Sequence, residues 1–364
     1  MKSILFISAF PPNQKTAGQD YTRRLILDLS KKGFEISLIY AGYPGHSVEL
    51  PSSVNVIKEI KSGFRNCLHH PFCHPFFTKR FDKNILNFIQ SIAHNYDMLY
   101  FDFSQVHFYS LFIEHPNKIL MCHDVIAQKF KRKGIFQLPW IKKTEGKILK
   151  TAKQIITFSE KDCLFIFKEY NLHSISVNFY LKNGNYKYKE MNIENDTFCF
   201  YGAWNRSENT ECLIWFLKHV YPSLQENIRF FVIGGGMDSS LKNQISKYKN
   251  IFYLGFVDDP IMEISKCQAL IAPLHRGAGV KVKVIDALSS GTPVIGTDVA
   301  FEGITDNKDR GLFYLAFKPK EYTGLLNNWS NLNTDYKQAA ANEFFNRYNC
   351  NHFSDIIKEN LNVQ

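Results

Sequence analysis

The sequence predicts a two-domain α/β protein with a parallel β-sheet in each domain, and three observations predict it. The chain has 364 residues, which is too long for one compact core. Apolar strand-like runs alternate with segments of helical periodicity, which is the pattern of βαβ units. The alternation stops in a polar, turn-rich stretch around residues 180–196 and then restarts. We therefore expect a linker there.

The first domain opens with a βαβ unit. SILFISAF is expected to be a buried strand, with a signal peptide as the less favoured alternative because the run is short and ends in two prolines. The next helix is ended by Gly33 and places four apolar residues on one face: Tyr21, Leu25, Ile26 and Leu29. EISLIYA, DMLYFDF, KILMCHD and QIITFS follow as strands. No G-x-G-x-x-G turn occurs, so a dinucleotide site is not supported.

The second domain repeats the alternation. Strands are expected at TFCFYGAW, RFFVIGGG, IFYLGFV, ALIAPL and PVIGT. Helices are expected between them: NTECLIWFLKHVYPSL, a helix that ends at about Tyr248, a short helix after IFYLGFV, and a helix that begins at about Lys281. The tail CNHFSDIIKENL is expected to be a helix. We place the domains at 1–185 and 186–345, and the closing helix at 346–364. Both domains are expected to be Rossmann-like.

Composition argues against a membrane-spanning protein, and the distribution of charge favours an anionic partner. Hydrophobic residues make up 45% and charged residues 21%, and no run reaches the ~20 apolar residues of a membrane span. Residues 1–190 carry 27 Lys and Arg against 15 Asp and Glu, whereas the rest has 17 against 19. FFTKRFDKN, QKFKRKGIF and WIKKTEGKILK mix aromatic and basic residues. They favour an anionic membrane surface or an acidic lipid-linked substrate, with a solvated surface or nucleic acid as alternatives.

The eight cysteines are scattered, mostly in apolar runs, as in a reduced cytosolic protein. CLHHPFCHPFF gathers cysteines and histidines, but its spacing matches no standard zinc pattern. We interpret it as a structural or partner-contacting loop and expect no metal site.

HRGAGVKVKVIDALSSGTPVIGT carries the main functional signal. Gly277 and Gly279 leave the backbone bare just before a helix, so that peptide N–H groups could approach an anion. Lys281 and Lys283 lie in the first turn, where a cation costs about 0.3–1 kcal/mol against the helix dipole. A bound anion would remove this cost; a tight turn with two exposed lysines is the alternative.

A resemblance to family 4 glycosyltransferases (group 1) covers nearly the whole chain and is strongest over about residues 200–304. The sugar-nucleotide domain of that family is similar in order and type to YGAWNRSENTECLIWFLKHVYPSL, RFFVIGGG, IFYLGFVDD, ALIAPLHRGAGVKVKVIDALSSGTPVIGT and FEGI. Its acceptor domain is similar to SAFPPNQKTAGQDYTRRLILDLSKKGFEISLI, CHDV and TFSEKD. The resemblance implies the GT-B fold, in which two Rossmann-like domains face across a cleft and the last helix crosses back to the first domain.

The resemblance also implies roles for individual residues. Asp286 takes the place of the second glutamate of the Glu-x7-Glu motif and would bind the ribose. The first glutamate falls on Ala278, so the backbone N–H groups of Ala278, Gly279 and Val280 are candidate substitutes. Arg206 and Lys281 or Lys283 would meet the diphosphate. Gly18 would let the backbone approach the phosphates, and His123 would contact the donor sugar near the reacting carbon.

Together these inferences predict a retaining, metal-independent hexosyltransferase without a cofactor. It would move a sugar from a nucleotide-diphosphate sugar to a hydroxyl of a glycan or lipid-linked glycan. We expect it to bind no nucleic acid and to act in the cytoplasm, or peripherally at the inner membrane face. Surface polysaccharide synthesis is the expected role. A non-catalytic sugar-nucleotide-binding partner of a glycosyltransferase is the main alternative, because the first motif glutamate is missing. A nucleic-acid-binding protein and a sugar-nucleotide epimerase are further rivals.

Overall fold

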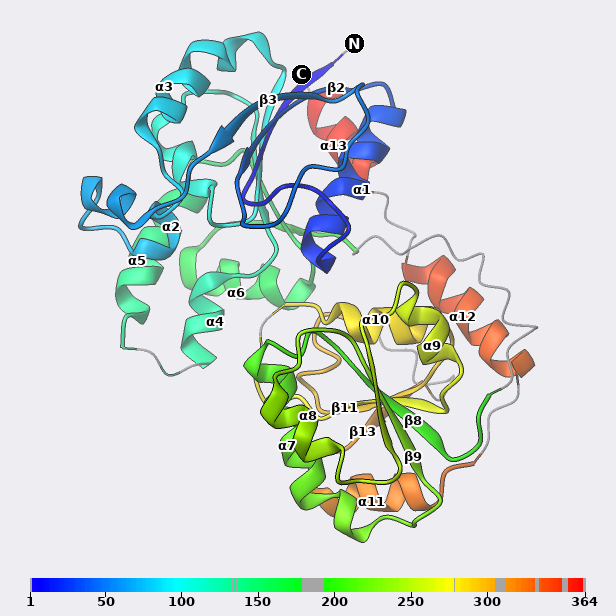
Figure 1. Cartoon of the computed structure of the whole chain (residues 1–364). Helices are drawn as coiled ribbons and strands as arrows, with labels where there is room; N and C mark the ends of the chain where they lie inside the picture. The colour runs from blue at the N-terminus through cyan, green and yellow to red at the C-terminus, as the bar shows by residue number, and fades with distance from the viewer. Residues whose placement is uncertain are drawn as a thin grey trace. The chain divides into compact units, whose positions relative to one another are not determined.

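The computed structural model describes residues 2–132, 134, 136–178, 193–277, 279–304, 312–330, 334–348 and 353–362. The chain divides into two compact units (Figure 1). Unit 1 comprises Met1–Tyr180 and Asn351–Gln364, and unit 2 comprises Leu181–Cys350. The expected linker lies largely outside the described residues.

Unit 1 is built on a parallel sheet of seven strands in the order β3-β2-β1-β4-β5-β6-β7. The strands are β1 (Ser3–Ser8), β2 (Glu35–Ala41), β3 (Asn55–Ile60), β4 (Met98–Asp102), β5 (Lys118–Cys122), β6 (Gln154–Thr157) and β7 (Ile175–Ser176). The first run of the chain is therefore a strand, and Ile4 to Ser8 are buried. The sequence did not reveal β3 and β7, because β3 is a mostly exposed edge strand without an apolar face and β7 has only two residues.

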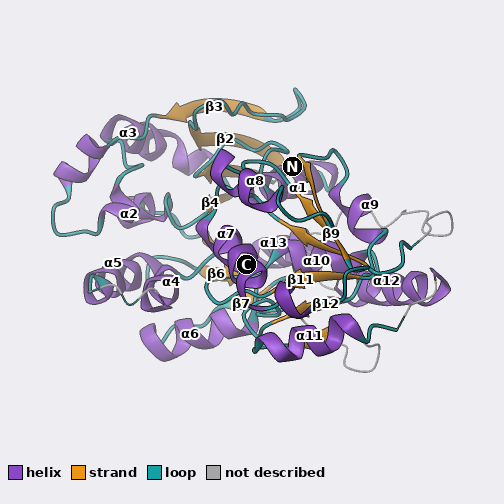
Figure 2. Ribbon diagram, turned by 60° about the horizontal axis from the view of Figure 1, so that its bottom comes forward, coloured by secondary structure: helices purple, strands orange, loops and turns teal. Residues whose placement is uncertain are grey.

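The helices of unit 1 cover both faces of the sheet (Figure 2). They are α1 (Ala17–Lys31), α2 (Pro75–Thr78), α3 (Lys83–Ile92), α4 (Ile126–Arg132), α5 (Leu138–Leu149), α6 (Glu160–Tyr170) and α13 (Phe353–Asn362), with short 3-10 segments η1 (Phe64–His69), η2 (Ala93–Asn95) and η3 (His107–Phe112). The side chain of Thr16 caps α1, and Gly33 follows its end with φ +86°. In Figure 1, α13 (red) lies beside α1 (blue), and Phe353 of α13 contacts Tyr21 of α1 and Tyr100 of β4.

Unit 2 has a parallel sheet of six strands in the order β10-β9-β8-β11-β12-β13. The strands are β8 (Thr197–Tyr201), β9 (Arg229–Ile233), β10 (Ile251–Gly255), β11 (Ala269–Ala272), β12 (Val294–Gly296) and β13 (Phe313–Leu315). The helices are α7 (Ser207–His219), α8 (Ser239–Ile245), α9 (Pro260–Ser265), α10 (Val282–Ser289), α11 (Pro319–Asn327) and α12 (Thr334–Tyr348), with a 3-10 segment η5 (Tyr221–Ser223). The predicted helix that extended to Leu224 ends at His219, because Pro222 starts a separate turn.

The two sheets share one feature that positions ligands. In both, the strand order reverses beside the first strand of the unit, between β1 and β4 in unit 1 and between β8 and β11 in unit 2. Loops leave such neighbouring strands in opposite directions, and the crevice at their carboxyl ends is where open α/β sheets bind ligands. The candidate site residues are therefore expected at these two positions.

Candidate functional site

The reversal point of unit 2 brings together the loop after β8 and the loop after β11. The β8 loop runs into α7 and the β11 loop runs into α10. The first turns of these two helices are joined by a hydrogen bond in which Lys283 Nζ of α10 donates to Asn209 Oδ1 of α7 at 2.8 Å. Asn209 is held in place because its Nδ2 donates to the backbone oxygen of Ala203 at 2.9 Å.

Two helices begin at this point without a side-chain cap. Arg206 occupies the N-cap position of α7, and Lys281 occupies that of α10; neither side chain accepts a hydrogen bond from the helix it precedes. The first turn of a helix has N–H groups with no partner inside the helix, and its dipole favours an anion. Both helix starts therefore retain donors for a bound anion.

The two lysines of α10 do not extend freely into solvent. The side chain of Lys281 is 12% exposed, and its Nζ lies 3.9 Å from Glu302 Oε2, whose side chain is 3% exposed. Lys281 Nζ also donates to the backbone oxygen of Gly279. The unfavourable position of these cations is thus partly offset by acceptors of the protein itself, a source of stabilisation that the sequence did not indicate.

Positive charge is nevertheless concentrated here. The pKa of Lys283 is lowered to about 8, first by desolvation and then by repulsion from Lys281 and Arg206, against the opposing influence of Cys212 and Glu208. Lys281 and Arg206 therefore both lie within electrostatic range of Lys283. Such an arrangement binds an anion well, because the anion relieves their mutual repulsion.

The glycines before α10 have conformations that favour glycine. Gly277 has φ +129° and Gly279 has φ +70°. A Cβ on Gly277 would lie 3.1 Å from Lys281 Cε, so the bare backbone also makes room for the lysine. Gly279 is buried and Val280 is half-buried, whereas Ala278 lies outside the described residues.

Asp286 lies on α10, one turn beyond Lys283, and is half-buried. Burial raises the pKa of Tyr201, and the charges of Asp286 and Asp259 raise it further. Since Tyr201 is the last residue of β8, Asp286 faces the same edge of the sheet as the cations. A carboxylate there could accept hydrogen bonds from hydroxyl groups.

The triple glycine after β9 has a packing role. Gly234 has φ +113°, and a Cβ on it would lie 2.0 Å from the backbone oxygen of Gly202. Trp204 N–H donates to the oxygen of Gly235 at 2.9 Å. These glycines let the turn after β9 pack directly against the loop after β8. Their packing therefore supports that loop at the reversal point.

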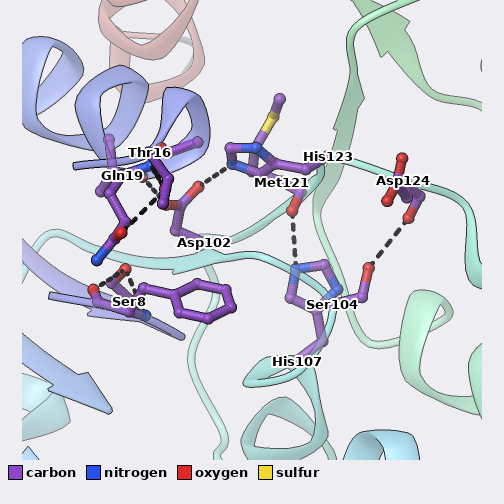
Figure 3. A network of polar contacts seen from close by, with 12 residues as sticks. Ser8, Thr16, Gln19, Asp102, Ser104, His107, Met121, His123 and Asp124 are labelled. Carbon is purple, nitrogen blue, oxygen red and sulfur yellow. Dashed lines mark hydrogen bonds and ion pairs between the residues drawn. The ribbon is translucent and has the colours of Figure 1, made fainter. Parts of the chain in front are cut away.

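The reversal point of unit 1 holds the other predicted residues (Figure 3). His123 follows β5, and its Nε2 is 2.8 Å from Oδ1 of Asp102, a fully buried carboxylate at the end of β4. The Oδ2 of Asp102 accepts from the hydroxyl of Thr22. The imidazole of His123 stacks on Phe103 with ring centroids 3.5 Å apart.

Gly18 is part of the same arrangement. Phe103 has φ +68°, and a Cβ on Gly18 would lie 3.0 Å from the Cζ atom of its ring. The absence of a side chain at Gly18 therefore gives Phe103 the space to stack on His123. His123 retains 11% of its side-chain exposure, so part of the ring remains accessible.

Sequence reasoning missed four residues of these two groups, which are Asp102, Phe103, Asn209 and Glu302. A polar or aromatic residue at the end of a predicted strand was the signal available for the first two. Each predicted residue that the structure describes is found with one of the two groups, and Ala278 lies outside the described residues. Gly18 and His123 are in unit 1, and Arg206, Gly279, Val280, Lys281, Lys283 and Asp286 are in unit 2.

The cysteine- and histidine-rich loop is packed by aromatic rings. His70 contacts Phe81, Phe108 and Phe112 at centroid distances of 4.8–5.3 Å, and His74 caps α2. Across the part of the chain that the structure describes, no three His, Cys, Asp or Glu side chains gather as metal ligands would. Nor does any described helix combine the length and apolarity needed to cross a bilayer.

Comparisons with known proteins find sequence matches for part of the chain. Residues 195–333 match the family described as glycosyl transferases group 1. An "Uncharacterized 44.6 kDa protein in cps region" from Klebsiella pneumoniae is 30% identical over 192 residues. That match spans about half of either chain, 48% in each case.

Solved structures match over the full length. WaaG, "a glycosyltransferase involved in lipopolysaccharide biosynthesis", is 14% identical with a TM-score of 0.65 and 99% of each chain covered. Anabaena HepE in complex with UDP is 14% identical with a TM-score of 0.67, and S. aureus TarM in complex with UDP and alpha-GlcNAc-glycerol is 13% identical with a TM-score of 0.69; both matches cover 100% of each chain. Residues 195–333 of unit 2 therefore match the group 1 glycosyl transferases by sequence, and the chain as a whole has the GT-B fold.

Proposed function

We propose that the protein is a retaining glycosyltransferase that moves a sugar from a nucleotide-diphosphate sugar to a hydroxyl of a glycan or lipid-linked glycan. The observation that carries the proposal is the start of α10. There Lys281 and Arg206 both lie within electrostatic range of Lys283, beside two uncapped helix starts. A diphosphate matches this arrangement in charge and in its number of hydrogen-bond acceptors.

The proposed chemistry breaks the bond between the anomeric carbon of the donor and an oxygen of the diphosphate. A new bond forms from that carbon to the acceptor oxygen, and the acceptor proton passes to the departing phosphate. Negative charge grows on the leaving oxygen, and each preorganised donor in such a site contributes on the order of 2.7–4 kcal/mol to its stabilisation. Lys281, Arg206 and the N–H groups at the start of α10 are proposed to supply this stabilisation without a metal or cofactor.

The remaining site residues have proposed roles that rest on the resemblance to family 4. Asp286 would accept hydrogen bonds from the ribose hydroxyls, and Lys283 would bind the diphosphate. Gly18 would admit the phosphates to the backbone of unit 1, and His123 would contact the donor sugar. Retention of configuration and transfer of a hexose rest on the same resemblance.

Two sets of matches support the choice of substrates. HepE is described in complex with UDP, glucose and UDP-glucose, and TarM in complex with UDP, so uridine diphosphate sugars are the first donors to examine. The names of WaaG and of the Klebsiella relative refer to lipopolysaccharide biosynthesis and to the cps region. They support a role in surface polysaccharide synthesis. We further propose that the protein acts in the cytoplasm, peripherally at the inner membrane face.

Thermal unfolding with a panel of nucleotides tests the binding step. A ligand present at 100 times its dissociation constant stabilises a protein by about 2.7 kcal/mol. For a unit of this size we expect the midpoint to rise by roughly 5–10 °C with UDP or a UDP-sugar, taking about 2–4 °C per kcal/mol. The double variant Lys281→Gln/Lys283→Gln should lose the shift. Lys247→Gln/Lys249→Gln, at two exposed lysines of the same unit, should keep it.

Transfer is then assayed with the nucleotide that binds. Release of nucleotide diphosphate that depends on an added glycan acceptor would support the enzymatic proposal. Binding without transfer or hydrolysis of any donor would instead identify a non-catalytic sugar-nucleotide-binding subunit, as Ala278 in place of the first motif glutamate allows. If no nucleotide stabilises the protein, the proposed function is wrong.

A further inference from the structure

Three of the most exposed large apolar side chains among the described residues lie in unit 1. Phe72 is 91% exposed, Phe136 is 88% exposed and Leu68 is 77% exposed. Leu68 belongs to η1, Phe72 to the loop between η1 and α2, and Phe136 to the loop before α5. Single exposed apolar side chains are common, whereas several that gather on one surface mark a site of interaction.

The two loops are joined by named contacts. Trp140 Nε1–H of α5 donates to the backbone oxygen of Phe72 at 2.8 Å. His74 Nε2 lies 3.1 Å from Gln137 Oε1, the residue next to Phe136, and its ring packs against that of Trp140 at 4.9 Å. Figures 1 and 2 both show α2 and α5 as neighbours. Phe72 and Phe136 are therefore presented by one connected part of the surface.

This part of the surface is strongly basic. Residues 61–81 contain four Lys and Arg and no Asp or Glu, and residues 125–150 contain eight Lys and Arg and a single acid, Glu145. Glu145 is buried, and its oxygens accept from the N–H groups of Ile126 and Ala127, so it does not reduce the exposed charge.

The exposed lysines of α5 share a face of the helix. Lys143 and Lys147 of α5 and Lys150 at its C-cap are exposed and follow the spacing i, i+4, i+7. The charge of Lys147 opposes the rise that burial causes in the pKa of Cys73, which places Lys147 near the residue that follows Phe72. The lysine face and the exposed phenylalanine are thus adjacent.

We propose that Leu68, Phe72, Phe136, Lys143, Lys147 and Lys150 form a docking patch that binds unit 1 to an anionic membrane surface. The apolar side chains would enter the boundary between headgroups and acyl chains, and the lysines would bind the headgroups. A membrane offers an apolar layer directly beneath its negative charge. Nucleic acid has no such layer, and the aliphatic Leu68 would gain nothing from stacking on bases. The inference names the residues that would hold unit 1 at the membrane face given under the proposed function, and it does not depend on the transfer reaction.

Co-sedimentation of the full chain with vesicles tests the docking patch. The unmodified protein should bind phosphatidylcholine vesicles that contain phosphatidylglycerol, bind pure phosphatidylcholine weakly, and lose affinity as salt is raised. Phe72→Ser and Phe136→Ser should each weaken binding about 10–100-fold, from the roughly 1.5–3 kcal/mol that burying a phenylalanine contributes. Lys143→Gln/Lys147→Gln/Lys150→Gln should weaken it on the order of 100-fold, at about 1 kcal/mol per lysine.

Matched variants in unit 2 control for exposure and charge. Phe256 is 78% exposed, so Phe256→Ser should leave vesicle binding unchanged. Lys218→Gln/Lys247→Gln/Lys249→Gln removes the same charge from exposed positions and should weaken binding by less than the α5 triple variant. Circular dichroism and thermal melting check that each variant is folded.

Two outcomes would overturn the docking patch. One is that the unmodified protein binds neither type of vesicle. The other is that Phe72→Ser and Phe136→Ser bind as the unmodified protein does while only the lysine variants lose affinity, since an acidic macromolecule bound through charge alone would behave in that way. Nucleotide binding by unit 2 is measured separately, so failure of this inference and failure of the proposed function are distinguishable.

Discussion

At the scale of single residues, His123 depends on groups that are far from it in sequence. Its ring is held by a hydrogen bond to Asp102 and by stacking on Phe103, and the edges of Tyr21 and Phe158 pack around it. A ring held on several sides keeps one orientation, which a sugar-contacting group requires. Nearby His107 is fully buried, and desolvation lowers its pKa to about 3, so this neighbour is neutral near pH 7 (Figure 3).

The substitution Asp102→Ala tests this arrangement. It would leave the Nε2 of His123 without its acceptor, at a cost of about 1–3 kcal/mol, whereas the hydroxyl of Thr22 would keep the backbone oxygen of Gly18 at 3.1 Å. We expect a lower free energy of unfolding in urea and a weaker stabilisation by the donor nucleotide sugar. Asp102→Asn keeps one acceptor oxygen and should recover part of the loss. Equal stability of Asp102→Ala and the unmodified protein would show that Asp102 does not hold His123.

At the scale of elements, α10 connects the fold to the proposed chemistry. Its amino end carries the lysines, and its carboxyl end is fixed by α12. Gly291, with φ +70°, packs so closely against α12 that a Cβ would lie 2.0 Å from the backbone oxygen of Lys337. The buried Nζ of Lys337 donates to the backbone oxygens of Ser265 and Cys267 at 2.6 and 3.0 Å. The close packing of its carboxyl end against α12 therefore fixes the direction of α10.

The lowered pKa of Lys283 predicts a pH dependence of nucleotide binding. Lys283 is cationic below about pH 8 and loses its proton as pH rises through that value. A diphosphate binds the cationic form, so the affinity for UDP should fall between pH 7 and 9.5, measured by isothermal titration calorimetry. Loss of one charge-assisted hydrogen bond, about 1.5–3 kcal/mol, corresponds to roughly a 10–100-fold change at the extreme.

Two variants separate the contribution of Lys283 from other titrations. Lys283→Met should bind UDP more weakly at pH 7 and show no step near pH 8. Lys281→Gln should keep a step but move it to higher pH, because repulsion from Lys281 helps to lower the pKa of Lys283. An unchanged pH profile in Lys283→Met would contradict the assignment of the step to this side chain.

At the scale of the whole molecule, both units repeat one strand order, and the last helix of the chain belongs to the first unit. Phe353 and Ile357 of α13 are buried in unit 1, and Lys32 of unit 1 pairs with Asp355 at 2.7 Å. Because the exposed ion pair contributes little, the attachment of α13 depends mainly on its apolar side chains.

Phe353→Ala should therefore destabilise unit 1 selectively. Removal of a buried phenylalanine costs about 3–5 kcal/mol. Hydrogen exchange followed by mass spectrometry should show faster exchange in α1 and β4 and unchanged exchange in the strands of unit 2. Phe256→Ala, at an exposed position, should change neither. Equal loss of protection in both units would mean that they unfold as one.

Most of the fold followed from local patterns. The apolar face of α1, the strands β1, β2, β4, β5, β6 and β8, and the lysines at the start of α10 were all visible in the sequence, because periodicity and helix-end chemistry are properties of neighbouring residues. The edge strands β3 and β13 were not visible. β3 is mostly exposed and β13 has only three residues, so neither strand has the buried apolar pattern from which a strand is predicted.

The partners of the site residues could not be read in the same way. Lys283 bonds Asn209, which is 74 positions away, and His123 bonds Asp102, which is 21 positions away and on another strand. Spacing along the chain predicts which residues share a face of one helix or strand. Only the packing of that element against others selects the acceptor, because a hydrogen bond or ion pair depends on distance in space. Local sequence therefore supplied the cations and the helix that carries them, and the folded sheet supplied the groups that hold them and lower the pKa of Lys283.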